Sequence, residues 1–308
     1  MRAKSIVVVG SSNTDMIIRV PRIPRAGETL LGGEFFSAAG GKGANQAVGA
    51  ARAGGKVAFI ARVGRDAFGD QAIAGLRRDG VDVRYVFRDK FAASGVALIF
   101  VAKDGENSIA VAGGANAKLS PADVKKASSV IGSAELLVAQ LETPLATVAA
   151  AAQAAVKARV PVILNPAPAR PLANSLLKLI SVLTPNETEA ELLTGIKVTD
   201  DAAAARACSA LRSRGVRTVI LTLGQRGAFL ADADGQRLVP GFRVKSVDST
   251  AAGDVFNGAL SVALAEGKTV LDAVRFANAA AALSVTRPGA QPSAPSRADI
   301  EKFLRNGR

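Results

Sequence analysis

The strongest constraint on this chain is a series of short apolar runs that contain no polar alternation. The first covers residues 6–9, and the others cover residues 57–60, 136–139, 162–164, 182–183 and 219–221. Such runs are typical of strands that are covered on both faces, as in parallel sheets. Alanine-rich helical patterns separate them, so the order of elements predicts a doubly wound α/β layer structure.

Some helix boundaries can also be predicted. Residues 187–194 are expected to form a helix that ends at Gly195, because glycine favours the left-handed conformation after a helix. Thr143 followed by Pro144 predicts a helix that is capped by the threonine and has proline at its first position. Further helices are expected over residues 200–211, 252–266 and 269–285.

Two pairs of strand-like segments interrupt this alternation. They cover residues 16–20 and 29–38, and residues 95–101 and 107–111. We expect them to form a small separate sheet that serves as a lid over a cleft, inserted at about residues 12–38 and 94–112 of a single domain, 1–308. The alternative is that they are edge strands of the main sheet.

Composition excludes several classes of function. Lys and Arg number 39 against 26 Asp and Glu, which gives a net charge of +13, but the basic runs contain no interleaved aromatic residues. Single-strand binding needs such aromatics, so we expect a solvated basic surface and no nucleic-acid partner. With no histidine and only Cys208, zinc sites, Ser-His triads and internal disulfides are excluded. No stretch reaches transmembrane length, so a cytoplasmic protein without membrane contact is expected.

The most informative segment covers residues 248–258, DSTAAGDVFNG. Its small residues precede an amphipathic helix, and the amide groups of Ala251, Ala252 and Gly253 could form an anion hole for a transferring phosphoryl group. Asp254 could then deprotonate an attacking hydroxyl. The alternative is an ordinary acidic residue in the first turn of a helix.

A second small-residue segment, residues 40–46 (GGKGANQ), also opens a helix. Its glycines allow close approach to the backbone, and Lys42 and Asn45 offer donors for sugar hydroxyls. A plain loop with a helix cap is the alternative. The motifs of P-loop and dinucleotide-binding proteins are both missing from the chain.

Polar residues also follow predicted strands. Asn13, Asp15 and Glu142 stand where open α/β sheets bind ligands, and together they suit a polyol, although a solvated loop is equally compatible. Asn186, with acidic residues close behind it, could hold Mg²⁺ through water, or those acids could serve only the first turn of a helix. Residues 222–227 form a glycine-punctuated turn that either wraps phosphates or closes a hairpin.

Residues 40–46 and 248–258 resemble the two glycine-rich motifs of the ribokinase (PfkB) family of sugar kinases. The similarity extends from about residue 5 to residue 304, with further segments at residues 10–15, 140–144, 164–169 and 184–189. It implies the family fold, a three-layer α/β/α sandwich with a small β-sheet lid, and a homodimer in which two lids clasp each other.

The resemblance implies ATP-dependent phosphorylation of D-ribose at O5, giving D-ribose 5-phosphate and ADP. Asp254 would be the base, and Ala251, Ala252 and Gly253 would form the anion hole. Ribose would be bound by Asn13, Asp15, Gly41, Lys42, Gly43, Ala44, Asn45 and Glu142. ATP would be bound by Asn186, Thr222, Leu223, Gly224, Gln225, Arg226, Gly227, Gly253 and Asn278, of which the last stands where relatives can carry histidine.

Metal ions are implied in the same way. Glu189 would help to place Mg²⁺ indirectly. K⁺ would be held, mostly through backbone carbonyls, by Asp248, Thr250, Ser284, Arg287, Gly289 and Ser293. The alternatives are another sugar, such as deoxyribose or fructose, a non-catalytic sugar-binding sensor on the same fold, and a nucleic-acid-binding protein, which only the net charge suggests.

Overall fold

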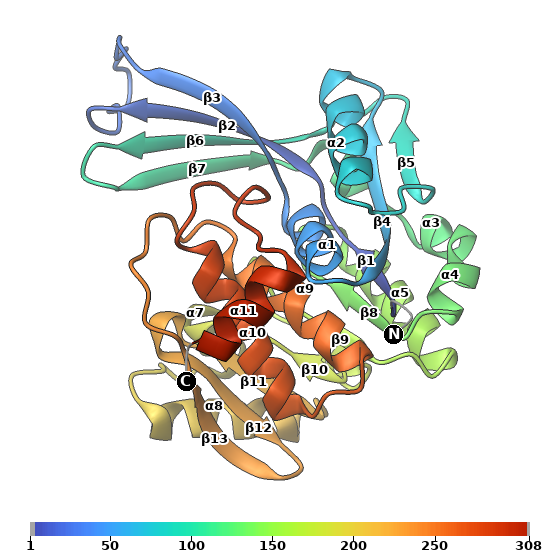
Figure 1. Cartoon of the computed structure of the whole chain (residues 1–308). Helices are drawn as coiled ribbons and strands as arrows, with labels where there is room; N and C mark the ends of the chain where they lie inside the picture. Colours follow the sequence, from blue (N-terminus) through green and yellow to red (C-terminus); the bar gives the residue numbers. More distant parts are fainter. Residues whose placement is uncertain (1–3, 307–308) are drawn as a thin grey trace.

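The main sheet is mixed and mostly parallel. The computed structural model describes residues 4–306, and within them nine strands pair in the order β13-β12-β11-β10-β9-β8-β1-β4-β5 (Figure 1). Only β12 and β13 are antiparallel to their neighbours. The strands are β1 Ser5–Val9, β4 Lys56–Gly64, β5 Val86–Asp89, β8 Leu136–Ala139, β9 Val162–Leu164, β10 Val182–Leu183, β11 Thr218–Thr222, β12 Gly227–Asp232 and β13 Gly235–Pro240. The predicted doubly wound α/β sheet is confirmed, but β5, β12 and β13 were not predicted.

Helices cover both faces of this sheet, because each central strand is apolar on both sides. Ile6 and Val8 of β1 belong to one buried cluster, and Val7 and Val9 belong to the other. The first face carries α1 Lys42–Arg52, α2 Ala67–Arg78, α9 Ala252–Ala265, α10 Val270–Ser284 and α11 Arg297–Asn306. The second face carries α3 Pro121–Lys126, α4 Ser128–Gly132, α5 Leu145–Lys157, α6 Asn174–Leu177, α7 Glu187–Thr194 and α8 Asp201–Ser213. The three-layer sandwich is therefore confirmed.

Most predicted helix ends are correct within a residue or two, with one instructive exception. Helix α7 ends at Gly195, whose φ is 73°. Thr143, however, does not cap α5. Pro144 occupies the N-cap with an extended ψ of 133°, so that helical geometry begins only at Leu145. The Thr143 hydroxyl has no hydrogen-bond partner among residues 4–306.

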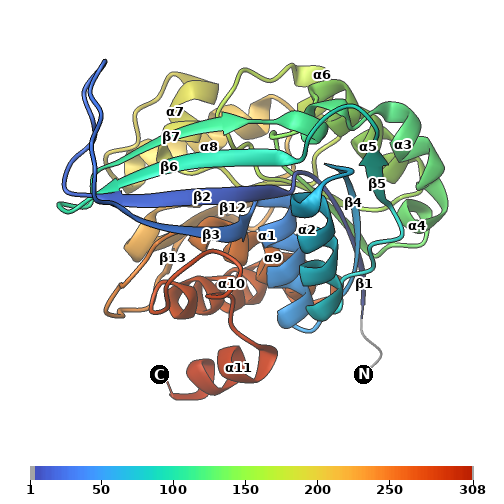
Figure 2. The same ribbon diagram turned by 90° about the horizontal axis from the view of Figure 1, so that it is seen from above.

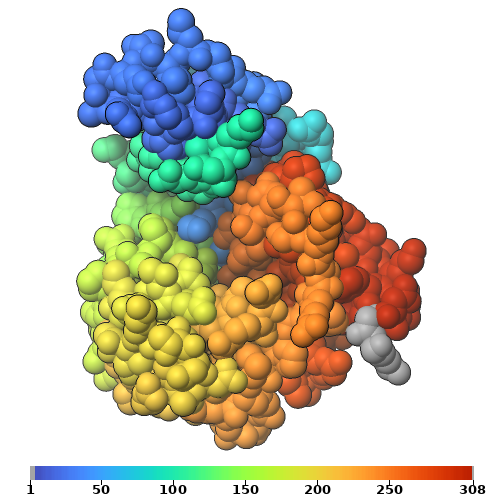
Figure 3. All heavy atoms as spheres, turned by 90° about the vertical axis from the view of Figure 1, so that its left-hand side faces the viewer, coloured from blue at the N-terminus to red at the C-terminus, as the bar shows by residue number. Residues whose placement is uncertain are grey.

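The four interrupting segments form a second sheet in the order β3-β2-β6-β7 within the described part of the chain. Its strands are β2 Asn13–Val20, β3 Glu34–Gly40, β6 Gly95–Ala102 and β7 Asn107–Ala112. None of them pairs with the main sheet, so the edge-strand alternative is wrong. The sheet projects from the body beside α1 and α2, and the surface beneath it is hollowed (Figures 1 and 3). Strand β3 begins at Glu34, five residues later than predicted.

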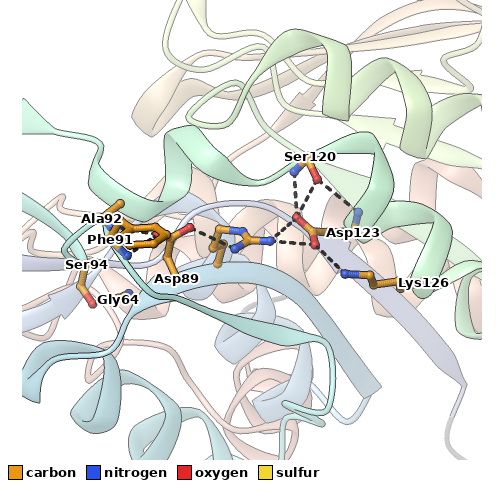
Figure 4. A network of polar contacts seen from close by, with 9 residues as sticks. Gly64, Asp89, Phe91, Ala92, Ser94, Ser120, Asp123 and Lys126 are labelled. Carbon is orange, nitrogen blue, oxygen red and sulfur yellow. Dashed lines mark hydrogen bonds and ion pairs between the residues drawn. The ribbon is translucent and has the colours of Figure 1, made fainter.

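A partly buried network of ion pairs and hydrogen bonds fixes the base of this second sheet to the main one (Figure 4). Arg62 on β4 donates to Asp89 at 3.0 Å and to both carboxylate oxygens of Asp123 at 2.8 Å. Asp89 accepts two amides of the turn that leads to Ser94, and the Ser94 hydroxyl accepts the Gly64 amide. The start of β6 is therefore anchored to the end of β4. Among residues 4–306, no helix combines the length and apolarity needed to cross a membrane.

Candidate active site

The site lies where the winding of the main sheet reverses. Strand β1 is paired on one side with β4 and on the other with β8. Within the main sheet, the chain continues to β4 after β1 and to β9 after β8, so the connections from these two neighbouring strands run in opposite directions. Open α/β sheets bind ligands in the crevice that such a reversal creates. Residues 11–15 follow β1 directly and Glu142 follows β8, which places these predicted polar residues at one edge of the sheet.

Helices α1 and α9 bring the rest of the site to this crevice. They lie side by side (Figures 1 and 2). Gly49 and Gly258 stand where the two helices touch. A Cβ atom on Gly258 would lie 2.6 Å from the Ala50 amide nitrogen, so only glycine permits this spacing. With the two helices this close together, Asn45 Nδ2 and Gln46 Nε2 both donate to the carboxylate of Asp254, at 3.1 and 3.0 Å. That carboxylate is buried, and Gln46, which was not predicted as a site residue, holds one of its oxygens.

The start of α9 presents free amide groups. Ala251 adopts the left-handed conformation, with φ of 59°, which is uncommon outside glycine and is typical of functional sites. Within residues 4–306 the amides of Ala251 and Gly253 have no hydrogen-bond partner, whereas Ala252 donates to the Ser249 carbonyl at 3.2 Å. A Cβ on Gly253 would meet no atom within 4 Å. Two of the three predicted anion-hole amides are therefore available, and that of Ala252 is engaged within its own turn.

The start of α1 is closed. The Lys42 amide donates to Glu142 at 3.0 Å, and the Gly43 and Ala44 amides donate to the side chain and the carbonyl of Ser11. A Cβ on Gly43 would lie 2.5 Å from the Ser11 amide nitrogen, and Gly41 has a φ of 88°. The glycines thus allow α1 to approach the end of β1. Gly43 and Ala44 were predicted to bind sugar, but their backbone amides donate to Ser11 instead.

Three carboxylates and one ammonium group share this crevice. Burial, together with the charges of Glu142 and Asp254, raises the pKa of Asp15 to about 6. Burial also raises the pKa of Asp254, although Lys42 and the two amide donors oppose the shift. Burial acts to lower the pKa of Lys42, but the charges of Asp254, Glu142 and Glu189 outweigh it, and the pKa is raised. Lys42 is therefore the charged partner that makes the cluster of acids tolerable.

Asn13 is held in a fixed orientation at the same edge. Its Oδ1 accepts a hydrogen bond from Asn116 Nδ2 at 2.7 Å, and Asn116 is 1% exposed. The Asn116 side chain also bonds both backbone groups of Ser12. Because Oδ1 is engaged, the amino group of Asn13 is the one left for a ligand. Asn116 was not predicted as part of the site.

A large cleft of about 1470 Å³ opens beside the start of α9. Leu223, predicted with the nucleotide-binding residues, is instead 3% exposed and packs in the core. Asn278 lines the cleft, but its amide group donates to the carbonyls of Val239 and Pro240 at 3.1 and 3.2 Å, so its carbonyl oxygen is the group left for a ligand. The remaining predicted nucleotide-binding residues also line the cleft: Asn186, Thr222, Gly224, Gln225, Arg226, Gly227 and Gly253.

Glu189 is buried and takes part in a capping box with Asn186. Its two carboxylate oxygens accept the backbone and side-chain N–H groups of Asn186, at 2.9 and 3.1 Å. Burial raises its pKa despite the nearby charge of Lys42. In residues 4–306 no three Asp, Glu or Cys side chains are arranged to hold a metal ion together. Glu189 does not line the cleft, whereas Asn186 does, so the indirect role in Mg²⁺ binding predicted for Glu189 stays a prediction.

The six residues predicted for K⁺ lie on the loop before α9 and on the end of α10 with the loop that follows it. The amides of Val247 and Asp248 donate to the Val285 carbonyl, and the Gly289 amide donates to Asp248 Oδ2 at 2.8 Å. Partial burial acts to raise the pKa of Asp248, but hydrogen bonds from Thr250 and Gly289 outweigh it and the pKa is lowered. The Ser284 hydroxyl donates to the Ala281 carbonyl within α10, and the Ser293 hydroxyl donates to the Ala290 carbonyl. An ionised carboxylate and backbone carbonyls are donors that fit a hard cation.

Comparison with known proteins gives matches over almost the whole chain. A model of the pfkB family of carbohydrate kinases matches residues 3–297. The chain is 47% identical to the ribokinase of Haemophilus influenzae over 301 residues, covering 98% of both, and 39% identical to the deoxyribokinase of Salmonella typhi, covering 97% of this chain and 98% of that one. The structure of Arabidopsis thaliana ribokinase complexed with ribose and ATP superposes with a TM-score of 0.90 at 36% identity, covering 98% of this chain and 99% of that one.

Proposed function

Because this chain belongs to the pfkB family of carbohydrate kinases, we propose that it transfers the γ-phosphoryl group of ATP to O5 of D-ribose. The observation that carries the proposal is the position of Asp254. Its carboxylate is buried between two side-chain donors of α1, and the residue before it contributes a free amide to the large cleft. A base and an anion-binding group are thus neighbours in the chain, as phosphoryl transfer to a hydroxyl requires.

Each group then has a defined role. Asp254 accepts the proton of the attacking hydroxyl, and the amides of Ala251 and Gly253 stabilise the charge that develops on the transferred group. Lys42 compensates the nearby carboxylates, and its charge also favours a phosphoryl group near Asp254. Asn13, Asp15 and Glu142 bind the other sugar hydroxyls, with the amino group of Asn13 directed by Asn116. The second sheet would cover the sugar and exclude water.

The metal ions enter the proposal through the donors that are present. Asn186 and Glu189 would hold Mg²⁺ through water, and the ion would neutralise phosphate charge when bound. Asp248 and the carbonyls of the 284–293 loop would hold K⁺, which would order the turn that carries Ala251. The donor sets fit both ions, and the two loops already meet at Gly289.

Choice of sugar is the open question within this function, since relatives named ribokinase and deoxyribokinase match the chain over similar lengths. We expect ADP release with ribose, and weaker release with deoxyribose and fructose, in a coupled assay of the purified protein with and without K⁺. Equal or higher turnover with deoxyribose would reject the ribose assignment. No turnover with any sugar would favour a non-catalytic sugar-binding protein.

The second sheet also supports a proposal about assembly. Adjacent residues point to opposite faces of a strand, and both Phe35 and Phe36 are exposed, by 64% and 38%. Leu98, Ile109 and Val111 are exposed as well. A sheet that is apolar on both faces needs a partner to cover it, and we propose a homodimer in which the two sheets clasp each other.

The cytoplasm suits this reaction because it supplies ATP. Cys208, the only cysteine in the chain, is a buried free thiol, and burial raises its pKa to about 12. The fold therefore depends on no disulfide, and a reducing compartment is compatible with it. We place the protein in the cytoplasm as part of the same proposal.

A further inference from the structure

Buried polar side chains run along the carboxyl edge of the main sheet, next to the site but outside the groups assigned above. Gln140 follows β8, Asn165 follows β9 and Thr184 follows β10, so three neighbouring strands each contribute one. Their exposed fractions are 1%, 8% and 1%. Buried polar groups are costly unless they are hydrogen-bonded, so a row of them calls for an explanation.

Gln46 of α1 is the centre of this row. Its Nε2 donates to Asp254 Oδ1 at 3.0 Å and to Asn165 Oδ1 at 3.1 Å, while its Oε1 accepts a hydrogen bond from Gln140 Nε2 at 2.6 Å. All of its hydrogen-bonding atoms are engaged, and the side chain is fully buried. A flipped carboxamide would turn its oxygen toward two other oxygens, so only one orientation is compatible with these neighbours.

The same chain of hydrogen bonds reaches the peptide that precedes Asp254. Asn165 Nδ2 donates to the Thr184 carbonyl at 3.1 Å, and the Thr184 hydroxyl donates to Asn257 Oδ1 at 2.7 Å. Asn257 Nδ2 in turn donates to the Gly253 carbonyl at 2.8 Å. The network therefore holds the carboxylate of Asp254 at one end and the backbone of its neighbour at the other.

Charged groups reach Asp254 from several other elements. Lys42 and Asn45 belong to α1, and Glu142 follows β8; the Lys42 charge and the Asn45 donor favour the ionised carboxylate, whereas Glu142 opposes it. Asp254 also interacts with Asp15 of β2 and Glu189 of α7, whose negative charges add to the opposition. Asn45 donates to Oδ2 of Asp254, and Gln46 donates to Oδ1. Loss of the Gln46 donor would therefore leave Oδ1 buried beside the amide network without that hydrogen bond.

We propose that Gln46, held by Gln140 and Asn165, is a positioning residue that fixes the orientation of the Asp254 carboxylate for proton transfer. The inference rests on the proposed function, in which Asp254 is the base. A buried carboxylate with one donor on each oxygen can turn only by losing a hydrogen bond, and the network makes that loss unfavourable. Positioning of this kind reduces the freedom of the base before the sugar arrives.

The test compares Gln46→Met, which keeps the length and removes the donor, with Gln46→Glu, which replaces the donor by a charge. Thr147→Val serves as the control, because Thr147 is equally buried and its hydroxyl donates to the Leu119 carbonyl away from the site. We expect Gln46→Met to lower kcat by about 10²-fold with little change in the KM for ribose. The acid limb of its kcat/KM profile should move to higher pH, because the ionised base has lost a donor. Gln46→Glu should move the limb further, and Thr147→Val should change neither.

Unchanged kcat and an unchanged acid limb in Gln46→Met would overturn the inference. The inference would also be overturned if Gln46→Met lost only thermal stability, to the same extent as Thr147→Val. The pKa of the Asp254 carboxyl, followed by carbon NMR in wild type and Gln46→Met, gives a readout that needs no turnover. If wild type phosphorylates no sugar, the proposed function fails by itself, and an unshifted NMR titration is then the result that rejects the role of Gln46.

Discussion

The two small-residue segments that open α1 and α9 look alike in sequence and behave oppositely in the structure. At α1, the amides of Lys42, Gly43 and Ala44 all donate to groups of the protein itself. At α9, those of Ala251 and Gly253 have no partner within residues 4–306, and Gly253 borders an open cleft. The amides at the start of α1 are used within the protein, and two of those at the start of α9 are left without a partner there.

The difference shows how small residues serve two purposes in one site. Glycines at α1 let a helix approach the end of β1, which fixes the side chains of Asn45 and Gln46. Those side chains then hold Asp254, the residue that follows the open amides of α9. The closed segment therefore supplies rigidity, and the open one supplies room for an anion. The proposed reaction would need both at the carboxylate of Asp254.

The largest effect is expected from Asp254→Asn at the open segment. The change keeps the size of the side chain but removes the base, so kcat should fall by about 10²–10⁴-fold. Nucleotide affinity, measured by calorimetry, should stay close to that of wild type, because the carboxylate does not line the cleft. Turnover at the wild-type rate would contradict the assignment of the base.

Gly43→Ala and Gly253→Ala test the comparison directly, because the same methyl group is added to each segment. At Gly43 the new Cβ would lie 2.5 Å from backbone atoms, and we expect the free energy of unfolding to fall by about 3 kcal/mol. At Gly253 it would meet nothing, and stability should change by less than about 0.5 kcal/mol. Turnover of Gly253→Ala should nevertheless fall about 10-fold, since Gly253 lines the cleft and the added methyl group would crowd the phosphoryl group in the proposed site.

Chemical denaturation and steady-state kinetics on both variants would check this pair. A Gly253→Ala protein with wild-type kinetics would mean that no ligand approaches the start of α9. A Gly43→Ala protein of unchanged stability would mean that the start of α1 is open after all.

Sequence patterns predicted the layers well because apolar runs and helix signals are local. The resemblance to the sugar kinase family is confirmed by the family model, and the fold with it. Strands β12 and β13 were missed because the interpretation stopped at the turn of residues 222–227. The hairpin that it left open is present, since β11 and β12 pair antiparallel across that turn. The boundary at Pro144 was misplaced because the extended conformation of that residue depends on its tertiary surroundings.

Within the site, the sequence indicated which residues lie close together. It did not indicate which of their donors and acceptors are already engaged by other groups of the protein. Nothing local distinguishes the engaged amide of Ala252 from the free one of Gly253, since that depends on the turn at Ser249. Gln46 and Asn116 were overlooked because their partners lie more than 90 residues away along the chain. The position of Gln46 at the end of the glycine-rich segment 40–46 was the available signal for the first of them.

A smaller, pH-dependent effect on the free energy of unfolding is expected from Asp15→Asn, among the residues proposed to bind the sugar. The pKa of Asp15 is raised to about 6, so its carboxyl contributes stability below its ordinary pKa, and that contribution is lost as pH rises through about 6. Asp15→Asn should therefore raise the free energy of unfolding near neutral pH by about 1–2 kcal/mol, less than the full shift implies because the carboxyl is partly solvated. Denaturation curves near pH 4 should coincide for the two proteins, while the KM for ribose should rise in the variant. A variant that is less stable at neutral pH would contradict this.

The smallest effect is expected from Gly49→Ala, at a point of the interface between α1 and α9 that has space for a methyl group. A Cβ on Gly49 would lie 3.4 Å from Val255 Cα, an ordinary contact, whereas one on Gly258 would lie 2.6 Å from the Ala50 amide nitrogen. Gly49→Ala should raise the free energy of unfolding by about 0.5–1 kcal/mol, because alanine loses less backbone entropy in a helix. Gly258→Ala is the matched opposite and should lower both stability and kcat, since it would separate Gln46 from Asp254. Both glycines lie in the same interface. Equal losses of stability and kcat in the two variants would therefore mean that neither glycine determines the distance between the helices, or the hydrogen bond from Gln46 to Asp254.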